Sequence, residues 1–443
     1  MDYYREYLDT LDDILSEFVS QKERFMLLGK TSANKAVKNT LWSKLILDGT
    51  REYYNKCRKQ GVSVSELKSE ILLLLSQKYG IADDDTAKLI HNDDFTNYDF
   101  LRQYKGTIVV FCMNARQIDL WIPIISQNDS SVLMLCNFDT EKSIFADGNF
   151  TVLELSFLSD RYIHNSYLER CFTAVFEYAN LFTMLINVLK PQQVMVMEGC
   201  HFETEILAAV CRPQSIETVC YQQGWPSVMH TRFRDMGYDR FITWGEEFNE
   251  LWRRYNPAVK FETGCYPYSI CKCKIGNAVT FFLQAPIIIS DDDYFDQLLQ
   301  LARYIAIQHS NVIVLIREHP EYRLRTEQKL KFEQMNNVEF VSDIPLYEVF
   351  ERTLISVSIF SSTIIESLVH NSIPFVLDPT TDGCYYPLVD DWGVEVHSLE
   401  SAKEKLAELI KDKTLQNKMF RGIEKWRPVY FYITDRQKKL YKK

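Results

Sequence analysis

Two groups of polar residues follow apolar runs in the second half of the chain. The runs 312–316 and 355–360 are typical of buried parallel strands. Open α/β sheets bind ligands beyond the carboxyl ends of such strands, where helices begin and backbone N–H groups point at anions. A histidine and several hydroxyls at neighbouring turns are able to hold a phosphate group without a metal ion. The residues concerned are Arg317, His319, Pro320, Ser361, Ser362, Thr363 and Glu366.

Each of these motifs also has a purely local explanation. Pro320 sets φ and ends a strand, so a His-Pro pair is often only a turn. A Ser-Ser-Thr sequence before a helix is often only an N-cap, which contributes about 1 kcal/mol. Arg317 has an equally good explanation as a salt-bridge partner of Glu318. The order and spacing of both motifs together favour a ligand site.

A second set of candidates lies earlier in the chain. Glu198 ends the strand-like run 193–197 and is a candidate acid or base, because the adjacent Gly199 lets a ligand approach closely. His230 is a second candidate for proton transfer. A loop containing glycine and proline follows the run 217–221, and its side chains are candidates for shaping a ligand pocket: Gln223, Gly224 and Trp225. Trp225 is equally well explained as a residue of the hydrophobic core.

A cluster of charged residues follows that loop. Asp235 lies close to Arg232 and Arg234, and these arginines would keep its carboxylate ionised. An aspartate in such a loop is more often a helix cap or an ion-pair partner. The sequence alone therefore leaves its role open.

The elements that must position these residues form more than one domain, because 443 residues exceed one ordinary core. Residues 1–90 show helical periodicity, and 91–275 and 276–420 alternate strands with helices, followed by a helical tail at 421–443. Two Rossmann-like α/β domains with a cleft between them are the predicted fold. The predicted strands are 107–112, 131–136, 193–197, 217–221, 279–283, 312–316, 338–341, 355–360 and 374–378.

Composition excludes several functional classes. The net charge of −10 argues against nucleic acid as a partner. The eleven cysteines are scattered, which is typical of reduced thiols in a cytosolic protein. The chain shows neither a secretory signal at its start nor an apolar run of eighteen residues. We therefore expect a cytoplasmic protein, either free or peripheral at the inner face of a bacterial inner membrane.

Neither a cofactor nor a metal ion is expected. The chain lacks a Walker A motif, a GxGxxG sequence after a strand and an HExxH sequence. Asp291, Asp292 and Asp293 contain the letters of a DxD metal motif. They follow the first strand of the second α/β domain and fit a helix cap better.

His319-Pro320 and Ser361-Ser362 resemble the HP and SS motifs that hold the CMP moiety in bacterial sialyl- and polysialyltransferases. The segments 221–226, 233–236 and 242–246 are more similar to bacterial capsule and O-antigen transferases, and most of all to the retaining β-Kdo transferases. The resemblance covers roughly residues 190–380. It implies a metal-independent GT-B-like fold and transfer of Kdo from CMP-Kdo to a lipid-linked or oligosaccharide acceptor.

The resemblance also implies roles for individual residues. Asp235 would be the nucleophile that carries the sugar, with Glu198 as acid/base and with Arg232 and Arg234 meeting the Kdo carboxylate. His319, together with Ser361, Ser362 and Thr363, would bind the phosphate. Other domains or subunits of a polysaccharide synthase are implied as partners.

Two alternatives stay open. The same fold would serve CMP-sialic acid or another nucleotide-activated group. A non-catalytic module that binds nucleotide sugar or glycan within a larger synthase would not need Asp235.

Overall fold

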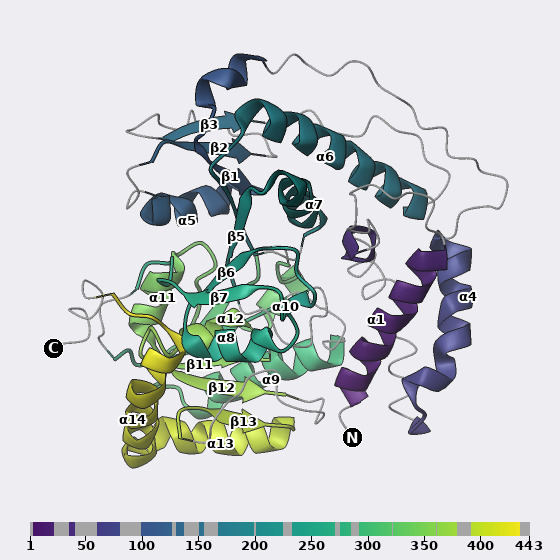
Figure 1. Ribbon diagram of the computed structural model, residues 1–443. Coiled ribbons are helices and arrows are strands. Elements are labelled where there is room, and N and C mark those ends of the chain that lie inside the picture. Colours follow the sequence, from purple (N-terminus) through teal and green to yellow (C-terminus); the bar gives the residue numbers. More distant parts are fainter. Residues whose placement is uncertain are drawn as a thin grey trace.

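The computed structural model contains two parallel β-sheets covered by helices, together with helices from the start of the chain (Figure 1). It describes residues 3–21, 35–39, 60–79, 99–125, 130–136, 150–154, 167–198, 201–224, 233–270, 275–284, 292–320, 322–359, 361–378 and 391–434.

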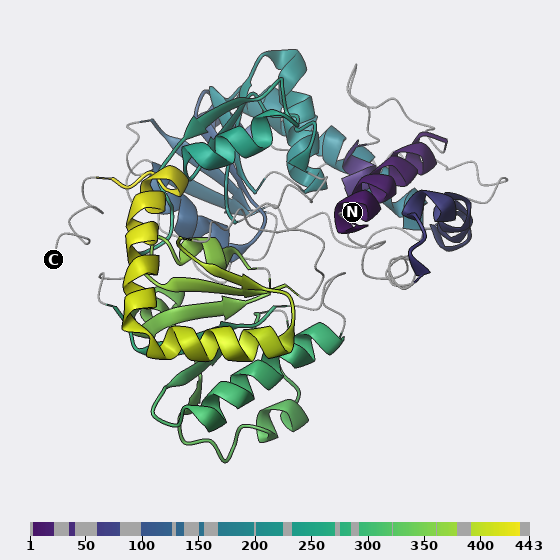
Figure 2. The ribbon, with the colours of Figure 1, turned by 90° about the horizontal axis from the view of Figure 1, so that it is seen from below.

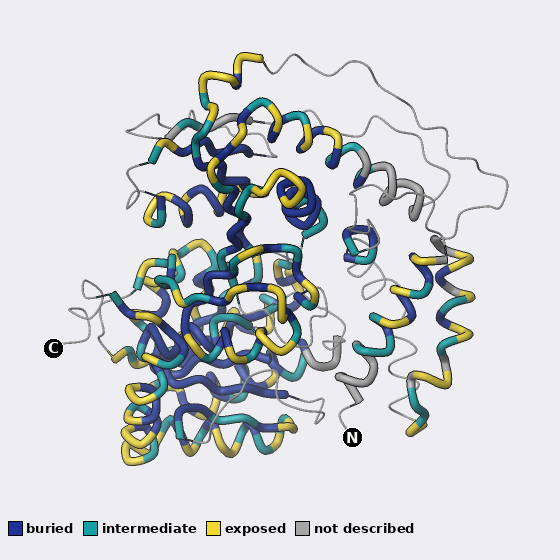
Figure 3. Tube along the Cα trace, in the orientation of Figure 1, coloured by how far each residue is buried: buried dark blue, intermediate teal, exposed yellow. Residues whose placement is uncertain are grey.

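The first sheet has seven parallel strands in the order β3-β2-β1-β4-β5-β6-β7. They are β1 (Ile108–Cys112), β2 (Val132–Cys136), β3 (Phe150–Glu154), β4 (Gln193–Met197), β5 (Glu217–Tyr221), β6 (Arg240–Thr243) and β7 (Lys260–Thr263). The accompanying helices are α5 (Ala115–Ile125), α6 (Tyr167–Leu189), α7 (Phe202–Cys211) and α8 (Glu246–Arg253), with short 3-10 turns at Asp99–Tyr104 and Arg212–Gln214. β1 and β2 are buried along their whole length and β4 along all but its first residue, as is typical of parallel strands between two helix layers (Figure 3).

The second sheet has six parallel strands in the order β10-β9-β8-β11-β12-β13. They are β8 (Ala278–Phe282), β9 (Val314–Arg317), β10 (Val338–Phe340), β11 (Thr353–Ser358), β12 (Ile373–Leu377) and β13 (Val394–Val396). The helices are α9 (Asp292–Gln308), α10 (Thr326–Leu330), α11 (Leu346–Arg352), α12 (Ser362–Glu366), α13 (Leu399–Lys411) and α14 (Lys413–Tyr430).

The N-terminal region is helical where it is described, with α1 (Tyr3–Gln21), a short helix at 35–39, a 3-10 turn at Val64–Leu67 and α4 (Lys68–Tyr79). α1 buries one face, which carries Leu11, Ile14, Leu15 and Phe18, and this agrees with the helical periodicity predicted for residues 1–90. Figure 1 shows α1 and α4 side by side next to the first domain. No helix among the described residues is both long and apolar enough to cross a membrane.

The end of the chain returns to the first domain. The chain from Leu399 to Tyr430 forms two helices, because the Asp412 side chain accepts the N–H of Thr414 and starts α14. α14 runs from the second domain to the first (Figure 2). Beyond its end, the Tyr432 N–H donates to the Trp244 carbonyl at 2.6 Å, and Phe431 stacks on the Trp244 ring. The predicted tail residues 435–443 lie outside the described residues, and the domain boundaries at 90, 275 and 420 stay predictions.

The predicted fold class is confirmed: two Rossmann-like α/β domains with helices at the N-terminus. Four strands are additional to the predicted ones, namely β3, β6, β7 and β13. Three of these lie at the edges of the sheets, where a strand is exposed on one side and its sequence is not a continuous apolar run. β6 has only four residues, which is too short to stand out from its surroundings.

Candidate functional site

The site is built at the carboxyl ends of β1 and β4. β1 lies between β2 and β4, so the direction in which strands are added to the sheet reverses there. Ligands of doubly wound sheets bind beyond such a switch point. Arg116 follows β1 in the first turn of α5, and Glu198 follows β4 directly. Both side chains therefore belong to the same edge of the sheet.

Glu198 has an unusual backbone conformation. Its φ is +74°, which side chains other than glycine rarely adopt, and its N–H donates to the Tyr221 carbonyl at 2.8 Å. The Glu198 carboxylate lies 3.2 Å from Nε2 of His201, the residue that precedes α7. Strain of this kind concentrates at functional positions. The structure thus gives Glu198 a partner, His201, that is absent from the predicted site.

Tyr268 connects the two chain segments that follow β1 and β5. Its hydroxyl donates to the Gln223 carbonyl at 2.5 Å, and the Arg116 guanidinium lies 5.2 Å from the centre of its ring. The Gln223 side chain in turn accepts from Gln117 of α5 at 2.8 Å. The predicted pocket residue Gln223 is therefore placed at this edge, with Gly224 directly after it.

Tyr266 extends this arrangement to the second domain. Its ring centre lies 5.2 Å from that of Tyr268, and its hydroxyl donates to Glu366 of α12 at 2.6 Å. Glu366 is buried, and burial raises the pKa of its carboxyl group against the opposing effects of Tyr266, Ser362 and Arg116. We call Arg116, Glu198, Gln223, Tyr266, Tyr268 and Glu366 the junction cluster.

The charges of the junction cluster influence one another across the two domains. Burial raises the pKa of Tyr268, the positive charge of Arg116 opposes this, and the negative charges of Glu366 and Glu198 add to it. Burial also lowers the pKa of Arg317, and the positive charges of Arg116 and Arg323 lower it further. Residues of the first domain therefore lie within electrostatic reach of the β9 and β11 turns.

The turn after β9 is held by its own polar residues. The Arg317 guanidinium donates to the carbonyls of Val341 and Ile344, at 3.0 and 2.5 Å, so its observed partners are backbone oxygens. The buried Glu318 carboxylate accepts from the Leu324 N–H at 2.7 Å and pairs with Lys329 at 3.0 Å. This frame positions His319, which is half-buried, and Pro320, which is exposed.

The turn after β11 shows the predicted cap. Ser361 precedes α12, and its hydroxyl accepts the Thr363 N–H at 3.4 Å and the Thr363 hydroxyl at 2.8 Å. Ser361, Ser362 and Thr363 are all half-buried. The expectation that the His-Pro and Ser-Ser-Thr turns are neighbours is wrong, because β8 lies between β9 and β11. Two strand spacings amount to roughly 10 Å, so the two turns flank the end of β8.

Asp235 lies in a different environment from Glu198. It precedes β6, its φ is +52°, and its N–H donates to the carbonyl of Tyr255, which precedes β7. These contacts place Asp235 towards the amino ends of the strands, whereas Glu198 lies at the carboxyl ends. Arg234 pairs with Asp9 of α1 at 2.7 Å and lies over the Tyr255 ring. The structure thus does not bring Asp235 and Arg234 together with the junction cluster.

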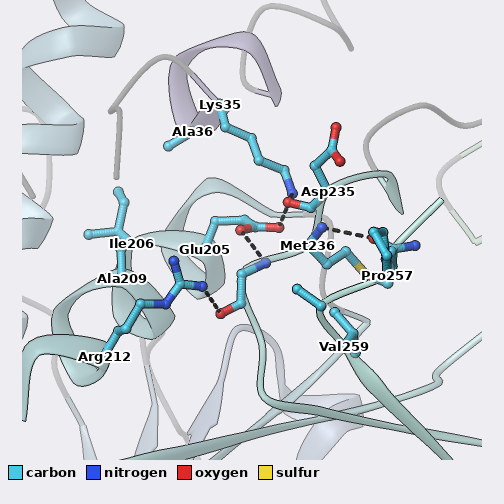
Figure 4. A pocket seen from close by; sticks show the side chains of 13 residues that line it. Lys35, Ala36, Glu205, Ile206, Ala209, Arg212, Asp235, Met236, Pro257 and Val259 are labelled. Carbon is cyan, nitrogen blue, oxygen red and sulfur yellow. Dashed lines mark hydrogen bonds and ion pairs between the residues drawn. The ribbon is translucent and has the colours of Figure 1, made fainter. Parts of the chain in front are cut away.

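Asp235 lines a cavity of about 240 Å³ between α7 and the N-terminal helical region (Figure 4). Lys35 reaches into it, where it pairs with the buried Glu205 at 3.0 Å and donates to the Asp235 carbonyl. Arg212 at the end of α7 donates to the Gly237 carbonyl at 2.9 Å. This cavity joins the N-terminal helical region to the first α/β domain.

Three of the predicted site residues, Trp225, His230 and Arg232, lie outside the described residues. Arg116, Tyr266 and Tyr268 are absent from the predicted site. Arg116 follows the predicted strand 107–112, so its position at a strand end was a usable signal. The two tyrosines lie in the connection between the domains, where local sequence gives no such signal.

One group of described residues has the composition of a cation site. Asp378 follows β12, and Glu395 and His397 lie on or next to β13, with potential ligand atoms all within 4.8 Å of one another. The His397 Nδ1 lies 2.9 Å from the Asp378 carbonyl. A metal-independent reaction stays a prediction.

The comparisons with known proteins concern the fold. No family model matches the sequence, and no curated protein matches it. Among solved structures, a UDP-N-acetylglucosamine 2-epimerase is similar with a TM-score of 0.52 and 11% identity, over 72% of this chain and 90% of that one. The wall teichoic acid polymerase TagF (H548A) has a TM-score of 0.46 and 11% identity, over 77% and 90% of the two chains. The sucrose-phosphate synthase of Thermosynechococcus elongatus has a TM-score of 0.46 and 11% identity, over 76% and 98%.

Of these three similarities, only the first exceeds a TM-score of 0.5, and at 11% identity it concerns the fold alone. The two parallel sheets and the helix that returns from the second domain to the first define the class: a two-domain fold of the GT-B type.

Proposed function

We propose that the protein is a glycosyltransferase that moves Kdo from CMP-Kdo to a bacterial surface polysaccharide, such as an O-antigen or a capsule. The observation that carries this proposal is the junction cluster, which places Glu198 and Arg116 of one domain near Glu366 and the β11 turn of the other. A transferase needs such an arrangement, because one domain must hold the leaving nucleotide while the other acts on the sugar.

The second domain supplies the phosphate side of the reaction. The bond between the anomeric carbon and a phosphate oxygen breaks, and CMP leaves with the electron pair. His319 is half-buried beside β8 and would donate to the phosphate, and the hydroxyls of Ser361, Ser362 and Thr363 would do so from the other side. Arg317 stabilises the turn, because its guanidinium donates hydrogen bonds to backbone carbonyls.

The first domain supplies the carboxylates. In a retaining reaction, a carboxylate attacks the anomeric carbon, and the acceptor hydroxyl then displaces it while a base takes the hydroxyl proton. Glu198 is the proposed acid/base, because it lies in the junction cluster. Asp235 is the proposed nucleophile on the sequence resemblance alone. A nucleophile and an acid/base must reach the same anomeric carbon, whereas Asp235 lies towards the other edge of the sheet from Glu198, so the experiment tests Asp235 separately.

The experiment is incubation with freshly generated CMP-Kdo, followed by intact-mass measurement and quantification of CMP. Wild type should release CMP and gain the mass of one Kdo unit. Glu198→Gln should still gain the adduct but should transfer the sugar to an added acceptor about 10²-fold or more slowly, the usual range for a lost general base. Asp235→Asn should abolish the adduct if Asp235 is the nucleophile. An adduct retained in Asp235→Asn would assign the nucleophile elsewhere.

CMP-sialic acid and UDP-N-acetylglucosamine serve as competing donors, measured by their effect on the melting temperature. A ligand present at one hundred times its dissociation constant stabilises the folded state by about 2.7 kcal/mol. Stabilisation by either competitor and not by CMP-Kdo would refute the Kdo assignment and retain a nucleotide-sugar site. Binding of CMP-Kdo without CMP release would favour a non-catalytic module.

A further inference from the structure

Arg234 was the described arginine expected to meet the carboxylate of the donor sugar, and it is engaged elsewhere. It pairs with Asp9 of α1 and lies over Tyr255, away from the junction cluster. An acidic sugar bound at the junction therefore needs a different cationic partner. Within the junction cluster, Arg116 is the cationic residue that could pair with the carboxylate of the sugar.

Arg116 has the geometry of such a partner. Its guanidinium lies 5.2 Å from the centre of the Tyr268 ring, and the Tyr268 hydroxyl is fixed by the Gln223 carbonyl at 2.5 Å. Arg116 is exposed and makes no ion pair with a carboxylate among the described residues. A guanidinium placed over an aromatic ring keeps its edge available for a planar, two-hydrogen-bond contact.

The charges around Arg116 favour an anionic ligand. Arg116 and Arg317 come from different domains, and the positive charge of Arg116 helps to lower the pKa of Arg317. An anion that enters between them would relieve this repulsion. Glu366, the nearby acidic residue of the second domain, is buried and its carboxyl is already hydrogen-bonded to Tyr266, so it supplies little compensation.

The position of Arg116 favours the carboxylate of the sugar over the phosphate of the nucleotide as its ligand. The residues proposed to hold the phosphate follow β9 and β11 in the second domain, whereas Arg116 follows β1 in the first, beside Glu198. The sugar extends from the phosphate towards the acid/base, so its own acidic group is the anion that reaches the first domain. A planar guanidinium also matches a planar carboxylate through two parallel hydrogen bonds.

We infer that Arg116, supported by Tyr268, is the specificity residue that binds the carboxylate of an acidic sugar in the donor. This inference rests on the proposed function and names the residue that would select a sugar acid in the donor.

The test compares the binding of CMP with that of freshly generated CMP-Kdo by calorimetry or thermal shift. Wild type should bind CMP-Kdo more tightly than CMP. Arg116→Gln should weaken CMP-Kdo binding by about tenfold or more and leave CMP binding unchanged, because the contact concerns the sugar alone. Arg116→Lys should lie between the two, because it retains the charge and loses the planar fork.

Arg254 provides a matched control, since its guanidinium also lies over a tyrosine of the same domain, 4.7 Å from the centre of the Tyr255 ring. Arg254→Gln should bind both ligands as wild type does. Equal weakening of CMP and CMP-Kdo in Arg116→Gln would assign Arg116 to the phosphate and overturn the inference. Unchanged binding of CMP-Kdo would overturn it as well. Failure of wild type to bind either ligand would refute the proposed function itself.

Discussion

At the scale of single residues, Glu198 combines a strained backbone with a place in the candidate site. A side chain at φ +74° costs about 1–3 kcal/mol relative to an ordinary conformation, and glycine adopts it without that cost. The fold thus retains a destabilising residue at the end of β4, where glycine would be the stable choice. That combination is expected when a side chain is required for chemistry.

Glu198→Gly should therefore stabilise the protein and inactivate it. We expect the free energy of unfolding to rise by about 1 kcal/mol, measured with urea, and transfer of the sugar to an added acceptor to fall to background. Glu198→Gln keeps the strain and should lose activity without the gain in stability. A Gly variant that retains activity would remove Glu198 from the mechanism.

Glu366 predicts a pH dependence of stability. Its pKa is raised in the folded state, chiefly by burial, so the carboxyl group favours folding at low pH. This contribution is fully present below the unfolded pKa and is lost as the pH rises through the folded value. The stability of wild type relative to Glu366→Gln should therefore fall as the pH rises above the ordinary carboxyl pKa of 4.5, as measured by urea unfolding at several pH values.

Glu262 is a control with the opposite sign. Hydrogen bonds from Arg240 and Lys260 lower the pKa of its carboxyl group. Its contribution is present above the unfolded pKa and is lost as the pH falls through the lower folded value. The stability of wild type relative to Glu262→Gln should accordingly fall on acidification. Parallel curves for the two variants would contradict both assignments.

At the scale of elements, strands buried on both sides were predictable because they form short, continuous apolar runs. β1, β4 and β11 are examples, and each is buried over most or all of its length. The edge strand β7 begins with Lys260 and also contains Glu262, so its sequence does not differ from that of a loop. Strand order is a further step that apolar runs do not determine, which is why β8 between the two polar turns was not foreseen.

The candidate site was predictable to the extent that it lies directly at strand ends. Glu198, His319 and Ser361 follow strands, and an apolar run with a polar residue after it indicates such a position. Tyr266 and Tyr268 belong to the connection between the domains, and only the three-dimensional fold brings this segment against Glu366 and Gln223. Asp235 has a carboxylate suited to a nucleophile, but it lies towards the amino ends of the strands, at the edge of the sheet opposite to Glu198.

The contact between the start of α8 and the end of α14 depends on Gly245. A β-carbon at this position would lie 2.3 Å from the carbonyl carbon and oxygen of Tyr430, which is closer than atoms can pack. Gly245→Ala should lower the free energy of unfolding by about 1–3 kcal/mol, as overpacking does in cores. Chemical denaturation measures this change. Gly224→Ala is the control, because a β-carbon there would have no neighbouring atom within 4 Å, and equal losses would contradict the explanation.

At the scale of the whole molecule, the reaction is predicted to need no metal ion. EDTA should leave CMP release from CMP-Kdo unchanged, because His319 and the hydroxyls after β11 are proposed to supply the donors to the phosphate. The group most able to bind a cation among the described residues consists of Asp378, Glu395 and His397, so it provides the test of this prediction. Loss of activity in EDTA, its restoration by Mn²⁺ and its absence in His397→Ala would show that this group holds a required cation.

The return of α14 has a consequence for how the molecule can be divided. The covalent connection from the first sheet to the second runs through residues 264–277, whereas the end of α14 is held on the first domain by packing and by hydrogen bonding to Trp244. A chain cut once in this connection would keep that second attachment. Two fragments produced separately, one for each sheet, should therefore reassemble into a complex. Co-elution of the fragments and recovery of CMP release would demonstrate this reassembly. The protein would then be a split enzyme, whose activity reports the association of its two fragments.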